Sequence, residues 1–338
     1  MSEISQELID NLVEEMGGAM HINPDEVIGG SKRKNRETTE STKKVYLNNI
    51  IRLHNKQPIK TKKNGQPDYD FLKDTDKILE RIGKLKGNSQ RTYLISIVTT
   101  LRGLKQYETV YNMYYELMMS LAEELKKNGN TKSETQKENW IEQDKVIEIY
   151  ENLKAEAVPL LNKKKVNDQE WEIILSFVVL SLYVLQAPRR NKDYQLMLYV
   201  NDKNLINSET AADFNYYLPK EKVMQFNQYK TKGSYQMQET AICPELATII
   251  AGYVKLHPLR KQKNFYLLVN HKGEPLLAVN AITRILNKIF GQRIGASMLR
   301  NIYLSDKFKG HMDELNKITT AMGTSASTGI GTYIKMDS

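Results

Sequence analysis

The sequence predicts a mainly α protein with a small antiparallel β-sheet, an α+β fold divided between two domains. Apolar residues recur at helical spacing from Thr38 to about Asn128, and again from Trp140 through Leu185. Between residues 196 and 242 the pattern changes to short alternating segments, which are typical of strands. A chain of 338 residues is long enough for two domains that each bury a core.

Residues 1–37 form a separate segment ahead of the first predicted domain. Residues 1–30 contain seven acidic residues and neither lysine nor arginine, and their apolar patches are compatible with a short helix. Gly29 to Arg36 then read as a flexible basic linker, which is either a solvated tail or an arm that contacts phosphates.

Residues 38–128 form a predicted helical domain, a compact bundle of about four helices. The first helix carries an apolar row, and a shorter helix lies near Asp76–Leu85. Asn88 or Ser89 can cap the next helix, and the last one ends before Asn128–Asn130. The apolar row of the first helix consists of Val45, Tyr46, Ile50 and Leu53.

The polar residues 129–139 mark the predicted domain boundary, and residues 140–338 form the second domain. This domain begins with helical sequence and continues with strands, with a turn at Gly233–Ser234 between the last two strands before the next helix. Its later elements are predicted at Leu196–Val200, Phe214–Leu218, Val223–Tyr229 and Tyr235–Ile242 (strands), Pro244–Leu256 (helix), Phe265–Val269 (strand) and Ile282–Ile289 (helix).

Composition excludes several kinds of site. Cys243 is the single cysteine, which rules out an internal disulfide and a cysteine-based zinc site, and the five histidines show no metal-ligand spacing. We therefore expect no metal and no cofactor. The longest apolar run, Ile173 to Leu185, is about half of a membrane span, and no signal peptide precedes it, so we expect a soluble intracellular protein.

The net charge of +9 favours a polyanionic partner. Because residues 1–30 are acidic, the excess of positive charge lies on the rest of the chain, as expected for contacts with nucleic-acid phosphates. A lysine-rich solvated surface would have the same composition. In the helical domain the candidate phosphate contacts are Lys43, Lys44, Arg91 and Arg102.

Three segments carry residues suited to phosphodiester chemistry. Residues 187–194 contain Arg189, Arg190 and Asp193, residues 297–305 contain Arg300, and residues 322–335 contain Tyr333. Two arginines can hold the non-bridging oxygens of a phosphate, and a phenolic oxygen can attack its phosphorus. The first arginine is either Arg190, with Asp193 three residues on, or Arg189.

In this order and spacing, the residues resemble the tyrosine recombinase (phage integrase) family, in particular the branch found in large DNA viruses and their satellite mobile elements. The family's first arginine box has an acidic residue that can orient the guanidinium at the interval from Arg190 to Asp193, so the resemblance favours Arg190 over Arg189. Leu299–Arg300 is similar to the family's His-x-Leu-Arg box. Met322–Ser325 is similar to Leu-Gly-His-Ser, with Tyr333 nine residues beyond Thr324. The resemblance implies a helical DNA-binding domain and a catalytic domain that cleaves and rejoins DNA through a 3′-phosphotyrosine. Lys230, with Lys232 as its rival, would protonate the departing 5′ oxygen.

The sequence departs from the family pattern where histidines are commonest. Ser297, Asn301 and Thr324 occupy these positions, and they can donate hydrogen bonds but cannot act as a base near neutral pH. His311, expected in a loop after the Arg300 helix, is a possible substitute.

The resemblance implies double-stranded DNA as the partner, synapsis as a homotetramer, and a location in the host cytoplasm or nucleus if the protein is viral. Two alternatives remain. One is a recombinase-derived protein that binds or packages DNA without cleaving it, and the other is a type IB topoisomerase-like enzyme that relaxes DNA.

Overall fold

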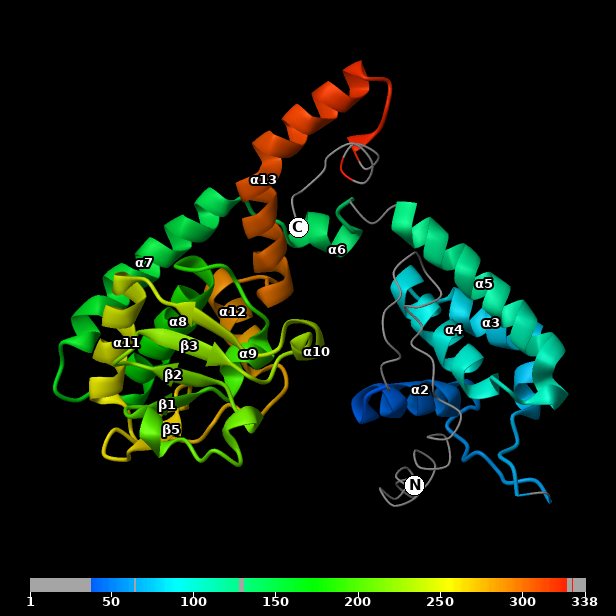
Figure 1. The fold of residues 1–338 in the computed structure, drawn as a ribbon, viewed down its shortest axis with the longest axis horizontal. Helices are drawn as coiled ribbons and strands as arrows, with labels where there is room; N and C mark the ends of the chain where they lie inside the picture. The colour runs from blue at the N-terminus through cyan, green and yellow to red at the C-terminus, as the bar shows by residue number, and fades with distance from the viewer. Residues whose placement is uncertain (1–37, 64, 128–130, 327–329, 331–338) are drawn as a thin grey trace. The chain divides into compact units, whose positions relative to one another are not determined.

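The computed structural model describes residues 38–63, 65–127, 131–326 and 330. The chain divides into two compact units, Met1–Lys132 (unit 1) and Ser133–Ser338 (unit 2), whose elements are labelled in Figure 1. The predicted acidic segment and basic linker, residues 1–37, lie outside the described residues.

Unit 1 is built from α-helices, as predicted. Tyr114 of the last helix donates its hydroxyl to the carbonyl of Leu72 (3.0 Å), and Asn49 of the first helix bonds through Nδ2 to Ser96 Oγ (3.0 Å). These bonds satisfy polar groups inside an otherwise apolar core. The described helices are α2 (Glu40–Leu53), α3 (Thr75–Gly83), α4 (Gly87–Leu101) and α5 (Glu108–Lys127), with 3₁₀ turns η2 (Asp70–Lys73) and η3 (Lys105–Tyr107).

Two details of the prediction for unit 1 are wrong. Neither Asn88 nor Ser89 caps α4, because the helix already begins at Gly87 with Lys86 in the capping position. A methyl group added to Gly87 would lie 3.0 Å from Leu125 Cδ2. The first residue of α4 is therefore packed closely against α5. In α2, Val45 is exposed while Leu47 is buried, so the apolar face is rotated from the predicted row.

Unit 2 begins with a helix inside the segment predicted as a polar linker. Helix α6 (Glu134–Asn139) starts at a capping box, in which Ser133 and Gln136 satisfy each other's backbone N–H groups. Asn139 Oδ1 then accepts a hydrogen bond from the backbone N–H of Arg293 (3.0 Å). This bond connects α6 to a segment about 150 residues later in the sequence.

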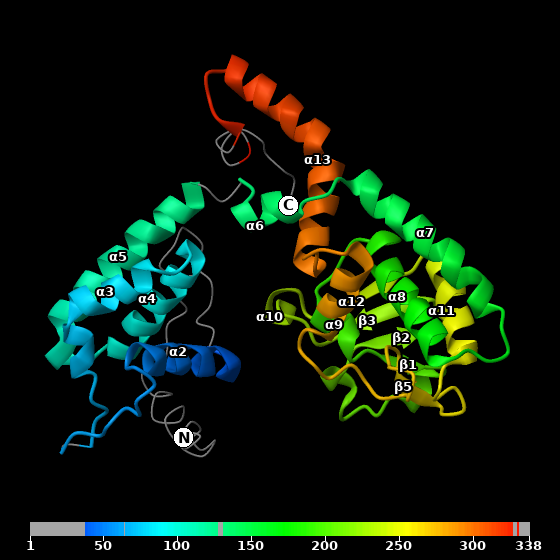
Figure 2. The same cartoon turned by 180° about the vertical axis from the view of Figure 1, so that it is seen from behind.

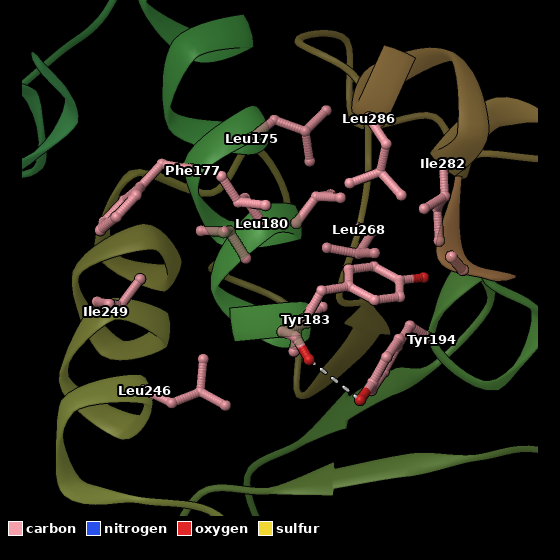
Figure 3. Packing of buried hydrophobic residues seen from close by; sticks show 14 of the residues in the cluster. Leu175, Phe177, Leu180, Tyr183, Tyr194, Leu246, Ile249, Leu268, Ile282 and Leu286 are labelled. Carbon is pink, nitrogen blue, oxygen red and sulfur yellow. Dashed lines mark hydrogen bonds between the residues drawn. The ribbon is translucent and has the colours of Figure 1, made fainter. Parts of the chain in front are cut away.

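The centre of unit 2 is helix α8 (Asp168–Val184), which is apolar on nearly every side. It packs against α7 (Gln143–Leu161), α11 (Pro244–Leu256) and α12 (Ala281–Phe290). Figure 3 shows Phe177 and Leu180 among side chains from α11 and α12, such as Ile249 and Leu286. A helix that is apolar all round has to be covered by other elements, and this position explains its composition.

A five-stranded sheet lies beside these helices in the order β4-β3-β2-β1-β5. The prediction of an antiparallel sheet is wrong in one respect, because β1 and β2 pair in parallel and the sheet is mixed. The other three pairings are antiparallel. The strands are shorter than predicted: β1 (Leu198–Val200), β2 (Tyr216–Leu218), β3 (Val223–Phe226), β4 (Gln238–Ala241) and β5 (Asn264–Tyr266), with 3₁₀ turns η4 (Lys203–Leu205) and η5 (Ala211–Asp213) between β1 and β2.

The connection between β3 and β4 also differs from the prediction. Gly233 and Ser234 do not form a simple turn but lie within the four-residue helix α10 (Lys232–Tyr235). Tyr229 closes this connection by donating its hydroxyl to the carbonyl of Gln236 (2.6 Å). Residues 227–237 are called the β3–β4 loop below.

The last described helix, α13 (Ala296–Ala321), is one continuous helix of 26 residues. His311, predicted to lie in a loop, is in the middle of it, because no proline interrupts residues 301–321 and Gly310 is accommodated within the helix. Figures 1 and 2 show the second half of α13 continuing past the body of unit 2.

The fold class is therefore confirmed as mainly α with a small sheet, which is mixed rather than antiparallel. Among the described residues, no helix is both long and apolar enough to cross a membrane.

Candidate functional site

The first arginine pair lies at the entrance to α9 (Asn191–Gln195), directly after the central helix α8 and a short extended segment. Arg190 is the residue that precedes the first turn of α9, and its backbone is extended. Arg189 and Arg190 are both half-buried. Because consecutive side chains of an extended backbone point in opposite directions, the two guanidinium groups have different surroundings.

Arg189, not Arg190, is the partner of Asp193. Arg189 Nε lies 3.1 Å from Asp193 Oδ2, and Asp193 is almost fully buried. Burial raises the pKa of Asp193, and the adjacent Arg189 guanidinium acts in the opposite direction by favouring the carboxylate. The expectation that Asp193 orients Arg190 is therefore wrong; only the backbone N–H of Asp193 bonds to Arg190, at its carbonyl oxygen (2.9 Å).

Arg189 also connects α9 to the β3–β4 region. Its Nη1 donates to Gln238 Oε1 (3.1 Å), and its guanidinium carbon lies 3.7 Å from the centre of the Phe226 ring. The Tyr229 ring is 5.2 Å away. Arg189 is thus held by a carboxylate, an amide and aromatic faces, whereas Arg190 has no side-chain hydrogen bond or ion pair to the residues that the structure describes.

The β3–β4 loop presents the two candidate lysines. Lys230 and Lys232 are both exposed, and the loop contains no acidic residue. Asn215 fixes its beginning: Oδ1 accepts from the backbone N–H groups of Asn227 (2.8 Å) and Gln228 (2.7 Å). Its Nδ2 donates to the carbonyl oxygens of Gln228 and Asp193 (2.9 Å each), so one buried amide joins this loop to α9.

A second chain of contacts joins α9 to the start of α13. Asn191 accepts a hydrogen bond from Tyr183 (2.8 Å) and donates one to Thr283 Oγ1 on α12 (2.8 Å). A methyl group added to Gly295 would lie 3.4 Å from Thr283 Cγ2, so the residue before α13 lies directly beside Thr283. In Figures 1 and 2, α9, α10, α12 and the start of α13 correspondingly lie close together.

Arg300 and Ser297 lie in the first turns of α13. Leu299 and Ile302 bury one side of this helix in the core of unit 2, while Ser297 and Asn301 are exposed on the other side. Arg300 is half-buried, and its side chain, like that of Arg190, has no hydrogen bond or ion pair to a described residue. These contacts bring together three segments, which carry Arg190, the lysine loop and Arg300, at one end of unit 2.

Thr324 is not part of this group in the structure. It follows α13, whose last residue, Ala321, lies about 32 Å from Arg300 along the helix axis at 1.5 Å per residue. His311 lies about 16 Å beyond Arg300 on the same helix, so it does not replace the missing histidines. Tyr333 lies outside the described residues.

The candidate DNA contacts of unit 1 are all half-buried. Lys43 forms an ion pair with Glu40 on the same helix (2.8 Å). Because Glu40 partly neutralises its charge, Lys43 is a weaker candidate for a phosphate contact. Arg91 lies in α4 and Arg102 follows its last residue, while Lys44 lies in α2.

Residues that position the site were missed by sequence reasoning. Asn191, Asn215, Gln238 and Thr283 carry its connections, and none of them belongs to a recognisable motif. The one available sequence signal is that Asn191 directly follows the arginine pair. Within the described residues, no three His, Cys, Asp or Glu side chains are grouped so that they could hold a metal ion.

Comparison of the chain with protein-family models, curated proteins and solved structures gives no match.

Proposed function

We propose that this protein is a DNA strand transferase of the tyrosine recombinase type, acting on double-stranded DNA. The observation that carries the proposal is the convergence of Arg190, the β3–β4 loop and Arg300 at one end of unit 2. These groups are cationic and come from three distant parts of the chain. A single phosphate is the simplest ligand that would use all of them.

In this proposal, Arg190 and Arg300 contact the non-bridging oxygens of the scissile phosphate. Each stabilises the charge that develops on the pentacoordinate phosphorus, and one well-placed donor of this kind is worth about 3–4 kcal/mol. Lys230 or Lys232 protonates the departing 5′ oxygen, and Tyr333 is the nucleophile. Arg189 acts as a positioning residue, because its contacts hold α9 against β3 and β4.

A second candidate function is DNA binding without cleavage. It is favoured by the position of Thr324 at the far end of α13 and by the absence of histidine at 297, 301 and 324. Cleavage requires Tyr333 to reach Arg300, either of the same chain or of a second copy of the chain.

Covalent trapping separates the two functions. The protein would be incubated with a pool of randomised nicked duplexes, and covalent protein–DNA adducts would be detected on a denaturing gel and sequenced. We expect an adduct that Tyr333→Phe abolishes while DNA binding persists. Tyr303→Phe is the matched control, because it removes a phenol from the same domain and should leave the adduct intact. Retarded DNA without any adduct would support the binding function instead.

A further inference from the structure

Helix α13 carries a row of mostly large apolar side chains, several of which are exposed in the described part of the chain. Leu304, Phe308, Ile318 and Met322 are each about half exposed. Helices in proteins are stabilised mainly by packing an apolar face against other elements. The exposed half of α13 therefore has an apolar face without a covering element among the described residues.

The row follows a heptad repeat. Its members are separated by alternating steps of four and three residues, which is the spacing of the seam in a coiled coil. The opposite side of the helix is polar, with Asp306, Lys309, Asp313 and Lys317. The members of the row are Leu304, Phe308, Leu315, Ile318 and Met322, which are apolar, and His311, which is polar.

We propose that this row is an interface between two copies of the chain, in which the two α13 helices pair antiparallel. A heptad seam is complementary to another seam of the same kind, so a second copy supplies a matching surface. This inference depends on the helix alone and not on the proposed DNA chemistry.

The charges beside the row favour the antiparallel arrangement. Lys307 and Glu314 flank the row on one edge, whereas Ser305, Met312 and Thr319 flank it on the other. In an antiparallel pair each edge faces the same edge of the other helix, so Lys307 meets the partner's Glu314, and this pair occurs twice. In a parallel pair opposite edges meet, and neither charge finds an opposite charge.

The same charges select a register. The pairing that joins Lys307 to the partner's Glu314 sets Leu304 against the partner's Leu315, and Phe308 against the partner's His311. A shift of one heptad would instead bring Glu314 against the partner's Glu314, and like charges at an interface are unfavourable.

Sedimentation equilibrium of the full chain tests the proposal. We expect a dimer that Phe308→Glu converts to a monomer; Phe308 is exposed, so the fold should persist by circular dichroism. A monomeric wild-type chain throughout the micromolar range would overturn the proposal.

Charge exchange tests the orientation. Lys307→Glu and Glu314→Lys should each weaken the dimer by about tenfold or more, because each places like charges together, and the double exchange should restore it. Lys309→Glu changes the net charge equally on the polar side and should leave the dimer unchanged. A double exchange that fails to restore association, or single exchanges without effect, would exclude the antiparallel register.

Discussion

At the scale of single residues, the adjacent arginines Arg189 and Arg190 have different roles. Arg189 neutralises the buried Asp193, and removing one partner of a buried ion pair leaves an uncompensated charge. Arg190 makes no side-chain hydrogen bond or ion pair within the described part of the chain, so its guanidinium can bind a phosphate without breaking a bond. One arginine therefore supports the fold, and the other is available for a ligand.

This difference predicts opposite effects of two alanine substitutions. Arg190→Ala should lower adduct formation by at least about a hundredfold with little change in melting temperature. Arg189→Ala should lower the free energy of unfolding by about 3 kcal/mol, and adding Asp193→Asn should recover part of it by removing the unpaired charge. Urea denaturation and the trapping assay measure the two effects. If Arg190→Ala unfolds the protein while Arg189→Ala is stable, the roles are reversed.

A buried histidine makes the stability of unit 2 dependent on pH. His257 is fully buried, stacks on Phe265 at 4.3 Å between ring centres, and lies near Trp171. Its Nδ1 accepts a hydrogen bond from the backbone of Leu259 (3.1 Å), and burial lowers the pKa of His257 to about 4. Its neutral form is therefore the one compatible with the fold.

The direction of the pH effect follows from the lowered pKa of His257. Between pH 6.5 and about 4 the unfolded chain binds a proton at His257 that the folded chain does not, so stability is present above pH 6.5 and falls as the pH drops. At pH 5 the loss relative to pH 7 should be about 2 kcal/mol. His257→Asn keeps an acceptor for Leu259 but cannot titrate, so its unfolding free energy should fall less over this range. An unchanged pH dependence in the variant would refute this assignment.

At the scale of elements, the connection of the lysine loop to the arginine segment depends on Asn215. Its side chain makes four hydrogen bonds to backbone groups of the loop and of Asp193, and it is almost fully buried. Asn215→Ala leaves these groups unsatisfied and should lower the unfolding free energy by about 3 kcal/mol. Amide hydrogen exchange should become faster in residues 227–237 and stay unchanged in α7. Uniformly faster exchange would indicate general destabilisation instead of a local connection.

The sequence predicts elements well where a local signal is strong. Helix α11 was predicted with its observed limits, because Pro244 at the first turn and an apolar stripe define it. The parallel pairing of β1 with β2 could not be predicted, since residues 201–215 contain only 3₁₀ turns and no helical crossover pattern.

The length of α13 was missed because Gly310, which costs about 1 kcal/mol in a helix interior, is typical of a helix end.

The candidate site was predicted only in part, for a related reason. The choice of Arg190 as the partner of Asp193 follows the interval in the family's arginine box, but here Arg190 is extended and α9 begins only at Asn191. Tertiary contacts determine which guanidinium group reaches the Asp193 carboxylate. Phe226 and Gln238 both contact the guanidinium group of Arg189. Such contacts from distant strands have no local sequence signal.

At the scale of the whole molecule, the chain contains separate cores. The larger core belongs wholly to unit 2, and the core built from α2, α4 and α5 belongs wholly to unit 1. Each unit therefore has its own source of stability. The proposed pairing of α13 uses residues of unit 2 alone.

The two proposals together make a prediction about how sites are shared. With Leu304 against the partner's Leu315, the end of α13 that carries Thr324 lies beside the start of the partner's α13, where Arg300 is. We expect that chains with Arg300→Ala and chains with Tyr333→Phe, each inactive alone, regain adduct formation when mixed. The intact arginine of one chain would then act with the intact tyrosine of the other. Adding Phe308→Glu to both chains removes the pairing and should abolish the recovery. If the wild type forms adducts and dimers but the mixture stays inactive, the arginine and the tyrosine of each site come from the same chain.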